Sequence, residues 1–313
     1  MITPGAFVPV AVTSRSGFDE SVHSGAVVCL GPSGEVVHAA GDPWVVIYPR
    51  SANKPLQATA MVGAGLRLPP HLLALVCASH DGTPAHIAGV REILDSAGLA
   101  ESQLANTADL PLEPAARDRV LRDGGSKSAI MQNCSGKHAG MLACCICNDW
   151  PTDARYLDPS HPLQQRITAE IEELAGEPVA HIGVDGCGAP AHAFSLVGLA
   201  RSFAAVARSR GEVYAAMTGR PEMVGGDRRD VTVLMRGVPG LMVKDGAEGV
   251  FAAALPDGRA VALKIADGAG RARAPVMLAA LGRLGVDTSA VAGSLVQHVL
   301  GHGRPVGEVR ALP

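Results

Sequence analysis

The chain has 313 residues, of which 47% are hydrophobic and 18% charged, so it can fold as a globular protein with a sizeable core. Its formal net charge of −3 at pH 7 gives no basic field, and this excludes nucleic acid as an expected partner. Aromatic residues make up only 3%, so alanine, valine, leucine and glycine must build most of the core.

The cellular location is predicted from the apolar stretches and the cysteines. The first residues lack the basic and apolar regions of a signal peptide, and no apolar stretch is long enough to span a bilayer. Seven cysteines, an odd number without a secretion signal, favour reduced thiols over a disulfide framework. We therefore expect a cytoplasmic protein that has no contact with membranes.

Strand patterns come first along the chain. Residues 7–13, 26–30, 36–40 and 45–48 are rich in strand-forming side chains, and a Gly-Pro-Ser-Gly turn between the second and third predicts a hairpin. The fourth strand runs directly into Pro-Arg-Ser, and this order predicts a strand, a short turn and then a helix.

The middle of the chain, about residues 55–225, reads mainly as helices. Apolar spacing predicts them over 57–66, 72–78, 84–97, 137–148, 162–174 and 199–210. Strands then return at 241–244, 250–254 and 260–265, separated by Asp-Gly turns, and a helix over 274–284 and a strand over 305–311 follow. We predict a single domain, 1–313, of the α+β type: an antiparallel sheet built from N- and C-terminal strands, with helices packed on it.

Lysine is scarce in this chain, which makes one serine–lysine pair informative. Only five lysines occur, and Lys54 follows Ser51 by three positions, on the same face of a predicted helix. A desolvated lysine can lose its proton and act as a base toward a hydroxyl, whereas arginine cannot. A surface serine beside a solvated lysine is the alternative for an isolated pattern of this kind.

Two other segments carry reactive side chains. Ser79 and His80 follow an apolar helix-like run, where the alternative is a helix-terminal serine and a surface histidine. Lys264 interrupts an apolar strand, and a lysine on the buried face must pair or lose its proton. An outward-facing strand lysine is the alternative there.

A possible metal site involves two cysteines. Cys134 and Lys137 are three residues apart, and Cys187 lies in a glycine-rich segment directly after Asp185-Gly186. The two thiols could bind a soft metal such as zinc, but buried cysteines packed as small apolar groups are an equal alternative.

Taken together and in order, five segments resemble the asparaginase II family. They are Arg50-Ser51-x-x-Lys54-Pro55-x-Gln57, Cys77-Ala78-Ser79-His80, Cys134-Ser135-Gly136-Lys137-His138, Asp185-Gly186-Cys187-Gly188 and Pro221-Glu222-Met223-Val224-Gly225-Gly226. The resemblance implies a fold like that of serine β-lactamases and glutaminases. It also implies hydrolysis of L-asparagine to L-aspartate and ammonia, and a homodimer.

The same resemblance implies the roles of individual residues. It implies two serine–lysine pairs, Ser51 with Lys54 and Ser79 with Lys264, because Lys264 falls where the family has its late lysine. The family's metal site maps onto Cys134, Lys137 and Cys187, and we expect zinc there, tuning binding and not generating the attacking water. We assign substrate binding to Arg50, His80 and Asp185.

The mechanism that we expect makes Ser51 the nucleophile and Lys54 its base. Ser79 and Lys264 would relay protons, although the sequence does not decide which serine is acylated. One departure from the family follows His80, where the chain has Asp81-Gly82-Thr83 in place of a small residue, glycine and glutamate. That change could alter substrate preference.

Three other functions stay open at this point. They are a related serine amidase such as a glutaminase or a β-lactamase-like enzyme, a zinc amidohydrolase in which metal-bound water attacks, and a non-catalytic zinc protein that binds amino acids.

Overall fold

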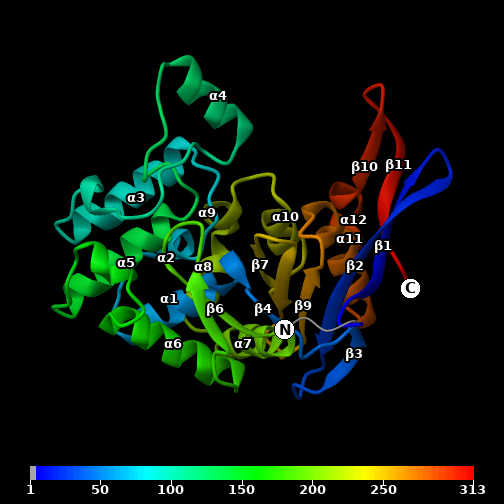
Figure 1. Ribbon diagram of the computed structural model, residues 1–313, viewed down its shortest axis with the longest axis horizontal. Helices are drawn as coiled ribbons and strands as arrows, with labels where there is room; N and C mark the ends of the chain where they lie inside the picture. Colours follow the sequence, from blue (N-terminus) through cyan, green and yellow to red (C-terminus); the bar gives the residue numbers. More distant parts are fainter. Residues whose placement is uncertain (1–4) are drawn as a thin grey trace.

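An eight-stranded antiparallel sheet forms the centre of the computed structural model, which describes residues 5–313 (Figure 1). Its order is β10-β11-β1-β2-β9-β8-β7, and β3 also pairs with β2. The strands are β1 (Val8–Arg15), β2 (Phe18–Leu30), β3 (Val36–Ala40), β7 (Met242–Gly246), β8 (Val250–Ala254), β9 (Ala260–Ile265), β10 (Gln297–Gly301) and β11 (Arg304–Ala311).

The two ends of the chain meet within this sheet. β2 pairs with β9 in the register Val27↔Leu263, and β1 pairs with β11 in the register Val12↔Arg310. β7, β8 and β9 are buried almost along their whole length, because helices cover them. The predicted fold class, an antiparallel sheet built from both termini and packed by helices, is therefore confirmed.

Helices occupy most of the chain between β4 and β7. They are α1 (Lys54–Gly63), α2 (Pro70–Val76), α3 (Pro84–Ser96), α4 (Pro114–Arg122), α5 (Ser135–Cys147), α6 (Pro162–Ala175), α7 (Leu196–Ser209), α8 (Glu212–Gly219), α9 (Pro221–Gly225) and α10 (Asp230–Gly237). Two more, α11 (Arg273–Arg283) and α12 (Ser289–Ala292), follow β9. Five of these helices begin with proline, whose missing N–H costs nothing in a first turn.

Two features of the fold differ from the sequence prediction. A second, three-stranded sheet of order β4-β6-β5 joins the predicted strand β4 (Val46–Ile47) to β6 (Pro190–Ser195) and β5 (His181–Val184), which lie within the region predicted as helical. β2 also begins eight residues before the predicted start at 26. Its first half is mostly polar and exposed where it forms a ribbon with β1, so it lacks the apolar run that marks a buried strand.

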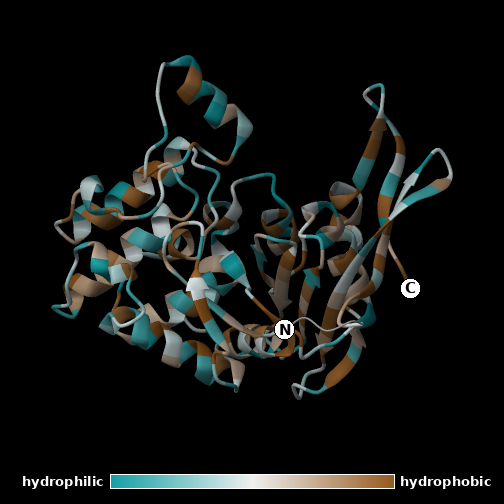
Figure 2. Cartoon of the chain, in the orientation of Figure 1, coloured by the Kyte–Doolittle hydropathy of each residue, from teal (hydrophilic) through white to brown (hydrophobic). Residues whose placement is uncertain are grey.

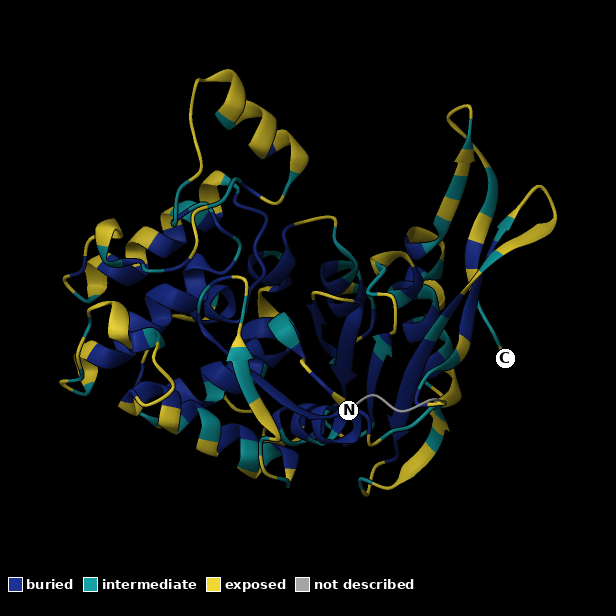
Figure 3. Cartoon of the chain, viewed as in Figure 1, coloured by how far each residue is buried: buried dark blue, intermediate teal, exposed yellow. Residues whose placement is uncertain are grey.

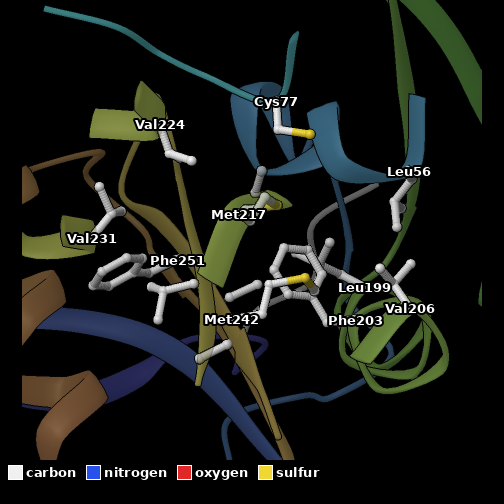
Figure 4. Packing of buried hydrophobic residues seen from close by; sticks show 14 of the residues in the cluster. Leu56, Cys77, Leu199, Phe203, Val206, Met217, Val224, Val231, Met242 and Phe251 are labelled. Atoms are coloured by element: carbon white, nitrogen blue, oxygen red, sulfur yellow. The ribbon is translucent and has the colours of Figure 1, made fainter. Parts of the chain in front are cut away.

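The main core includes the space between the sheet and α7, where Phe203 and Leu199 lie on the side of Met242, whereas Phe251 lies across the strands beside Val231 (Figure 4). Burial is concentrated there and in the helices beside it, whereas α4 and the tips of the hairpins are exposed (Figure 3). α4 projects from the body and is mostly hydrophilic, while the central strands are hydrophobic (Figure 2). Within residues 5–313, no helix is long and apolar enough to cross a membrane.

Candidate active site

Ser51 lies at the start of a helix, directly after a strand, as the sequence predicts. β4 leads through Pro49 into a 3₁₀ turn, η1 (Arg50–Asn53), and α1 begins at Lys54. Arg50 has a φ of 53°, a left-handed conformation that is costly for a residue with a side chain and that occurs most often at functional sites. The hydroxyl of Ser51 makes no hydrogen bond to any residue in the range 5–313, so it is free to meet a substrate.

The buried amine of Lys54 contacts Ser79 and not Ser51. Its Nζ donates hydrogen bonds to the carbonyl oxygen of Ala78 and to Ser79 Oγ, the latter at 3.3 Å. Lys54 is buried and Ser51 partly exposed, because η1 turns the serine away from the helix core. Lys54 of the first predicted serine–lysine pair and Ser79 of the second therefore lie together.

The second amine at Ser79 belongs to Lys244, which corrects the predicted pairing with Lys264. Lys244 Nζ lies 2.9 Å from Ser79 Oγ, whereas Lys264 is only partly buried and its Nζ donates to the carbonyl oxygen of Glu248. The sheet order explains the difference. β7, which carries Lys244, is the edge strand packed beside η1, whereas β9, which carries Lys264, lies two strands further in.

The environment of Lys244 makes its neutral amine easier to form. Burial lowers its pKa to about 8, the Asp245 carboxylate opposes this shift, and the charges of Lys54 and Arg229 reinforce it. Lys244 Nζ also donates to Asp245 Oδ1 at 2.5 Å. A lysine with a pKa near 8 can accept a proton from a hydroxyl close to neutral pH.

Arg50 and Asp185, two of the predicted substrate-binding residues, form an ion pair beside Ser51. The Arg50 guanidinium approaches Asp185 Oδ1 at 2.7 Å through Nη2 and at 2.8 Å through Nε. Burial alone would raise the pKa of Asp185, but the charges of Lys137 and Arg50 lower it, so this carboxylate stays ionised. A cation and an anion next to each other match the two charges of an amino acid's backbone groups.

Two hollows adjoin the Arg50 side chain. One has a volume of about 500 Å³, and its charged lining residues are Arg50, Glu248 and Lys264, with His181 and Tyr48 beside them. The other, of about 240 Å³, is lined by Arg50, Tyr48 and the β5–β6 hairpin. Arg50 is thus reachable from outside the protein, as a substrate-binding residue must be.

Cys134, Lys137 and Cys187 come together as the sequence predicts. All three are buried, and Lys137 Nζ lies 3.1 Å from Cys187 Sγ. A hydrogen bond from Cys134 lowers the pKa of Cys187 to about 5; burial opposes that shift and the Lys137 charge assists it. The Cys134 thiol, which donates this bond and is buried, has its pKa raised to about 12. Cys187 is therefore a thiolate beside an ammonium.

The donor atoms of these three side chains are of the kind that bind a soft metal. Two sulfurs and a nitrogen converge in one buried place, and a metal would require the loss of the protons now held by Cys134 and Lys137. Among residues 5–313, no group of three or more histidine, cysteine, aspartate or glutamate side chains is arranged to hold a metal ion. A metal at this site would therefore need Lys137 as a ligand.

The comparison with protein families decides the family. The model of the L-asparaginase II family matches residues 11–311, nearly the whole chain. The chain belongs to the L-asparaginase II family. Membership identifies it as an enzyme of the amidohydrolase type, although it does not fix the substrate.

Comparisons with other proteins add little to this identification. No curated protein matches the chain. A β-lactamase (Mb2281c) from Mycobacterium bovis is 18% identical, covers 83% of this chain and 94% of its own, and has a TM-score of 0.41. Mglu in its native form is 17% identical over 89% and 70%, with a TM-score of 0.44. A probable glutaminase from Bacillus subtilis, complexed with 6-diazo-5-oxo-L-norleucine, is 11% identical over 84% and 85%, with a TM-score of 0.29.

His80, the remaining predicted substrate-binding residue of this L-asparaginase II protein, is fully buried. Its Nδ1 accepts a hydrogen bond from the Gly82 backbone N–H at 3.1 Å, and its Nε2 lies 2.8 Å from Ser135 Oγ. Burial and nearby cations hold its pKa well below the usual value, so the ring is neutral. With both ring nitrogens occupied, His80 fixes the Ser79 loop to α5, and we withdraw its assignment to substrate contact.

Three residues of the site were missed in the sequence: Lys244, Asp245 and Arg229. Arg229 donates to the carbonyl oxygen of Ser79 at 2.5 Å and forms an ion pair with Asp245. The scarcity of lysine, which drew attention to Lys54, could have drawn it to Lys244 as well. Lys244 ends the apolar segment Leu241–Val243 directly before an Asp-Gly turn.

Proposed function

We propose that the protein hydrolyses L-asparagine to L-aspartate and ammonia through an acyl-enzyme on Ser51. Family membership supports the reaction class, and the observation that supports serine–lysine chemistry is the Ser79 hydroxyl held between the amines of Lys54 and Lys244. Ser51 is favoured over Ser79 as nucleophile because it is more exposed and its hydroxyl is free, whereas the Ser79 hydroxyl is already engaged by both lysines.

In this proposal substrate binding brings Ser51 to the Lys54 amine, which takes the proton of the Ser51 hydroxyl while Ser51 Oγ bonds to the side-chain amide carbon of asparagine. The oxyanion is stabilised by backbone amides at the start of η1, a contribution that can reach about 3 kcal/mol. The C–N bond then breaks, and the departing nitrogen takes that proton and leaves as ammonia. Water cleaves the β-aspartyl ester with the same amine as base. Ser79 connects Lys54 to Lys244, so excess protons can pass between the two amines.

Substrate recognition falls to Arg50 and Asp185. The guanidinium fork suits the α-carboxylate of asparagine, and the Asp185 carboxylate suits its α-ammonium group. When the amino acid binds, each of its charges would replace part of the existing ion pair, so neither protein charge is left unpaired. Lys264 lies outside this set and lines the larger hollow.

We also propose zinc at Cys134, Lys137 and Cys187, where a bound metal would supply a fixed positive charge that helps to orient the substrate. The chain's own residues perform the proton transfers described above. The homodimeric state and the cytoplasmic location stay predictions from the sequence.

Ammonia release from L-asparagine and L-glutamine, and ring opening of a β-lactam, by the wild type and by Ser51→Ala and Ser79→Ala, test the proposal. We expect asparagine to be the best substrate and Ser51→Ala to lose activity by about 10³-fold or more. Burst kinetics that persist in Ser51→Ala but vanish in Ser79→Ala would move the nucleophile to Ser79. Preference for glutamine or a β-lactam would replace the substrate, and activity that needs metal but not Ser51 would indicate metal-bound water.

A further inference from the structure

Asp81 is buried at the edge of the active site, at the position where the chain departs from the family pattern. Its side chain is packed against Gly226, a residue with a φ of 70°. A Cβ atom at Gly226 would come within 1.9 Å of Asp81 Oδ2, so only glycine leaves room for the carboxylate there. The backbone carbonyl of Asp81 also accepts a hydrogen bond from the Glu113 N–H at 3.0 Å, so Asp81 is held on both sides.

One guanidinium connects Asp81 to the reacting groups. Arg229 Nη1 lies 3.9 Å from Asp81 Oδ1 and donates to the carbonyl oxygen of Ser79, while Nη2 forms an ion pair with Asp245. Asp245 in turn accepts a hydrogen bond from Lys244 through its other oxygen. Asp81 and Asp245 therefore share a single arginine, and they are placed on opposite sides of it.

We propose that Asp81 is a positioning residue that sets, through Arg229 and Asp245, how readily Lys244 gives up its proton. This inference rests on the proposed function, in which Lys244 exchanges protons with Ser79. While Asp81 is ionised, it compensates part of the Arg229 charge, and the Asp245 charge remains available to the Lys244 ammonium. When Asp81 is neutral, the Arg229 charge draws more strongly on Asp245, with Asp230 as the other nearby acid, and the ammonium form of Lys244 is less favoured.

The charge of Asp81 can change in the physiological range. Burial raises its pKa to about 6, against the lowering effect of Arg229. The other charged groups that act on Asp81 are Glu113, Asp245 and Asp227, and those that act on Lys244 are Asp245, Lys54 and Arg229. Arg273 also pairs with Asp245, at 3.4 Å. As the pH falls through about 6, Asp81 becomes neutral and Lys244 holds its proton less strongly, which opposes the loss of free amine in acid.

Direct titration of the lysines tests this without relying on turnover. The protein has only five lysines, so protein labelled with ¹³C at lysine Cε gives at most five signals, and the spectrum of Lys244→Arg identifies the Lys244 signal. We expect the midpoint of its titration to fall by about one pH unit in both Asp81→Asn and Asp81→Ser, since each removes one charge near a buried pair. Asp81→Glu keeps the charge and should keep the midpoint within a few tenths of a unit.

Asp227→Asn is the matched control because Asp227 lies in the segment between α9 and α10 that carries Arg229 but is 78% exposed, so its charge is screened by water. The Lys244 titration midpoint in Asp227→Asn should equal that in the wild type. Equal Lys244 midpoints in the wild type, Asp81→Asn and Asp81→Ser would overturn the inference, as would an equal shift in Asp227→Asn. The Lys244 signal can be titrated without substrate. A protein inactive on asparagine would therefore contradict the proposed function, while the titration would still test the role of Asp81. In an active protein, the acid limb of kcat/KM should shift to lower pH in Asp81→Asn by the same amount.

Discussion

Lys244 Nζ lies 2.9 Å from Ser79 Oγ although 165 positions of sequence separate the two residues. The hydroxyl is thereby shared by an amine from the N-terminal helix α1 and an amine from the C-terminal strand β7. β7 packs beside η1, the turn that leads into α1, and this long-range contact brings the two amines together.

Replacing Lys244 or Lys264 with arginine tests whether the functional partner of Ser79 is Lys244, as observed, or Lys264, as predicted. Arginine keeps the positive charge but cannot give up its proton, so Lys244→Arg should lower kcat for asparagine by about 100-fold or more. Lys264→Arg should stay within about threefold of the wild type, because Lys264 is partly exposed and bonded to a backbone carbonyl. Ammonia release by both variants, with thermal unfolding as a check of the fold, measures this. The reverse order would restore Lys264 as the partner of Ser79.

The sequence was sufficient for the fold class and for local pairs, and it failed where sheet order decides contacts. Cys134 and Lys137 are one helical turn apart, so their proximity could be predicted from spacing alone. The pairing of Ser79 with Lys264 rests on the family resemblance. Both Lys264 and Lys244 follow apolar strand segments before Asp-Gly turns, and nothing in the sequence says which strand lies beside η1. The burial of His80 was hidden for the same reason, since its partner Ser135 lies 55 residues away.

Activity should rise with pH through the titration of Lys244. The proposed reaction needs free amine, and burial places the pKa of Lys244 near 8. The value of kcat/KM for asparagine should therefore be low near pH 6 and approach a plateau above about pH 8.5. Initial rates across pH 5.5–9.5 at low substrate measure this profile. A rate that is flat over the whole range would show that Lys244 does not titrate in the reaction.

The thiolate of Cys187 should make the metal-free protein more stable as the pH rises. Its pKa is lowered from 9.0 to about 5 in the folded protein, so the stabilisation is fully present above pH 9 and is lost as the pH falls through 5. The free energy of unfolding should therefore increase between pH 5 and 8.5, and by less in Cys187→Ser. Urea unfolding with a chelator and a reductant present measures both slopes. Parallel curves for the two proteins would mean that Cys187 is a neutral thiol.

Zinc binding should depend on the buried cysteines and not on the exposed one. Cys187→Ser and Lys137→Met each remove one of the three proposed ligands, so the metal content of purified protein should fall from about one zinc per chain to a small fraction. Cys147→Ser is the matched control, because Cys147 is exposed and outside the site. Elemental analysis after dialysis against a weak chelator gives the metal content. Equal zinc in all four proteins would exclude this site as the place of binding.

The ion pair between Arg50 and Asp185 should act mainly on substrate binding. Asp185→Asn removes the proposed partner of the α-ammonium group, so KM for asparagine should rise by about tenfold or more while kcat changes less. Asp185 also faces the Arg50 guanidinium, so a higher KM alone does not show that Asp185 binds the ammonium group. Succinamate, an analogue of asparagine without the ammonium group, separates the two roles. Wild type should prefer asparagine to succinamate, and Asp185→Asn should lose most of that preference.

Asp153→Asn, which breaks the exposed pair with Arg155 far from Ser51 in sequence, should leave both constants unchanged. If Asp185→Asn kept the full preference for asparagine, the ammonium group would be recognised elsewhere and Asp185 would serve only to hold Arg50.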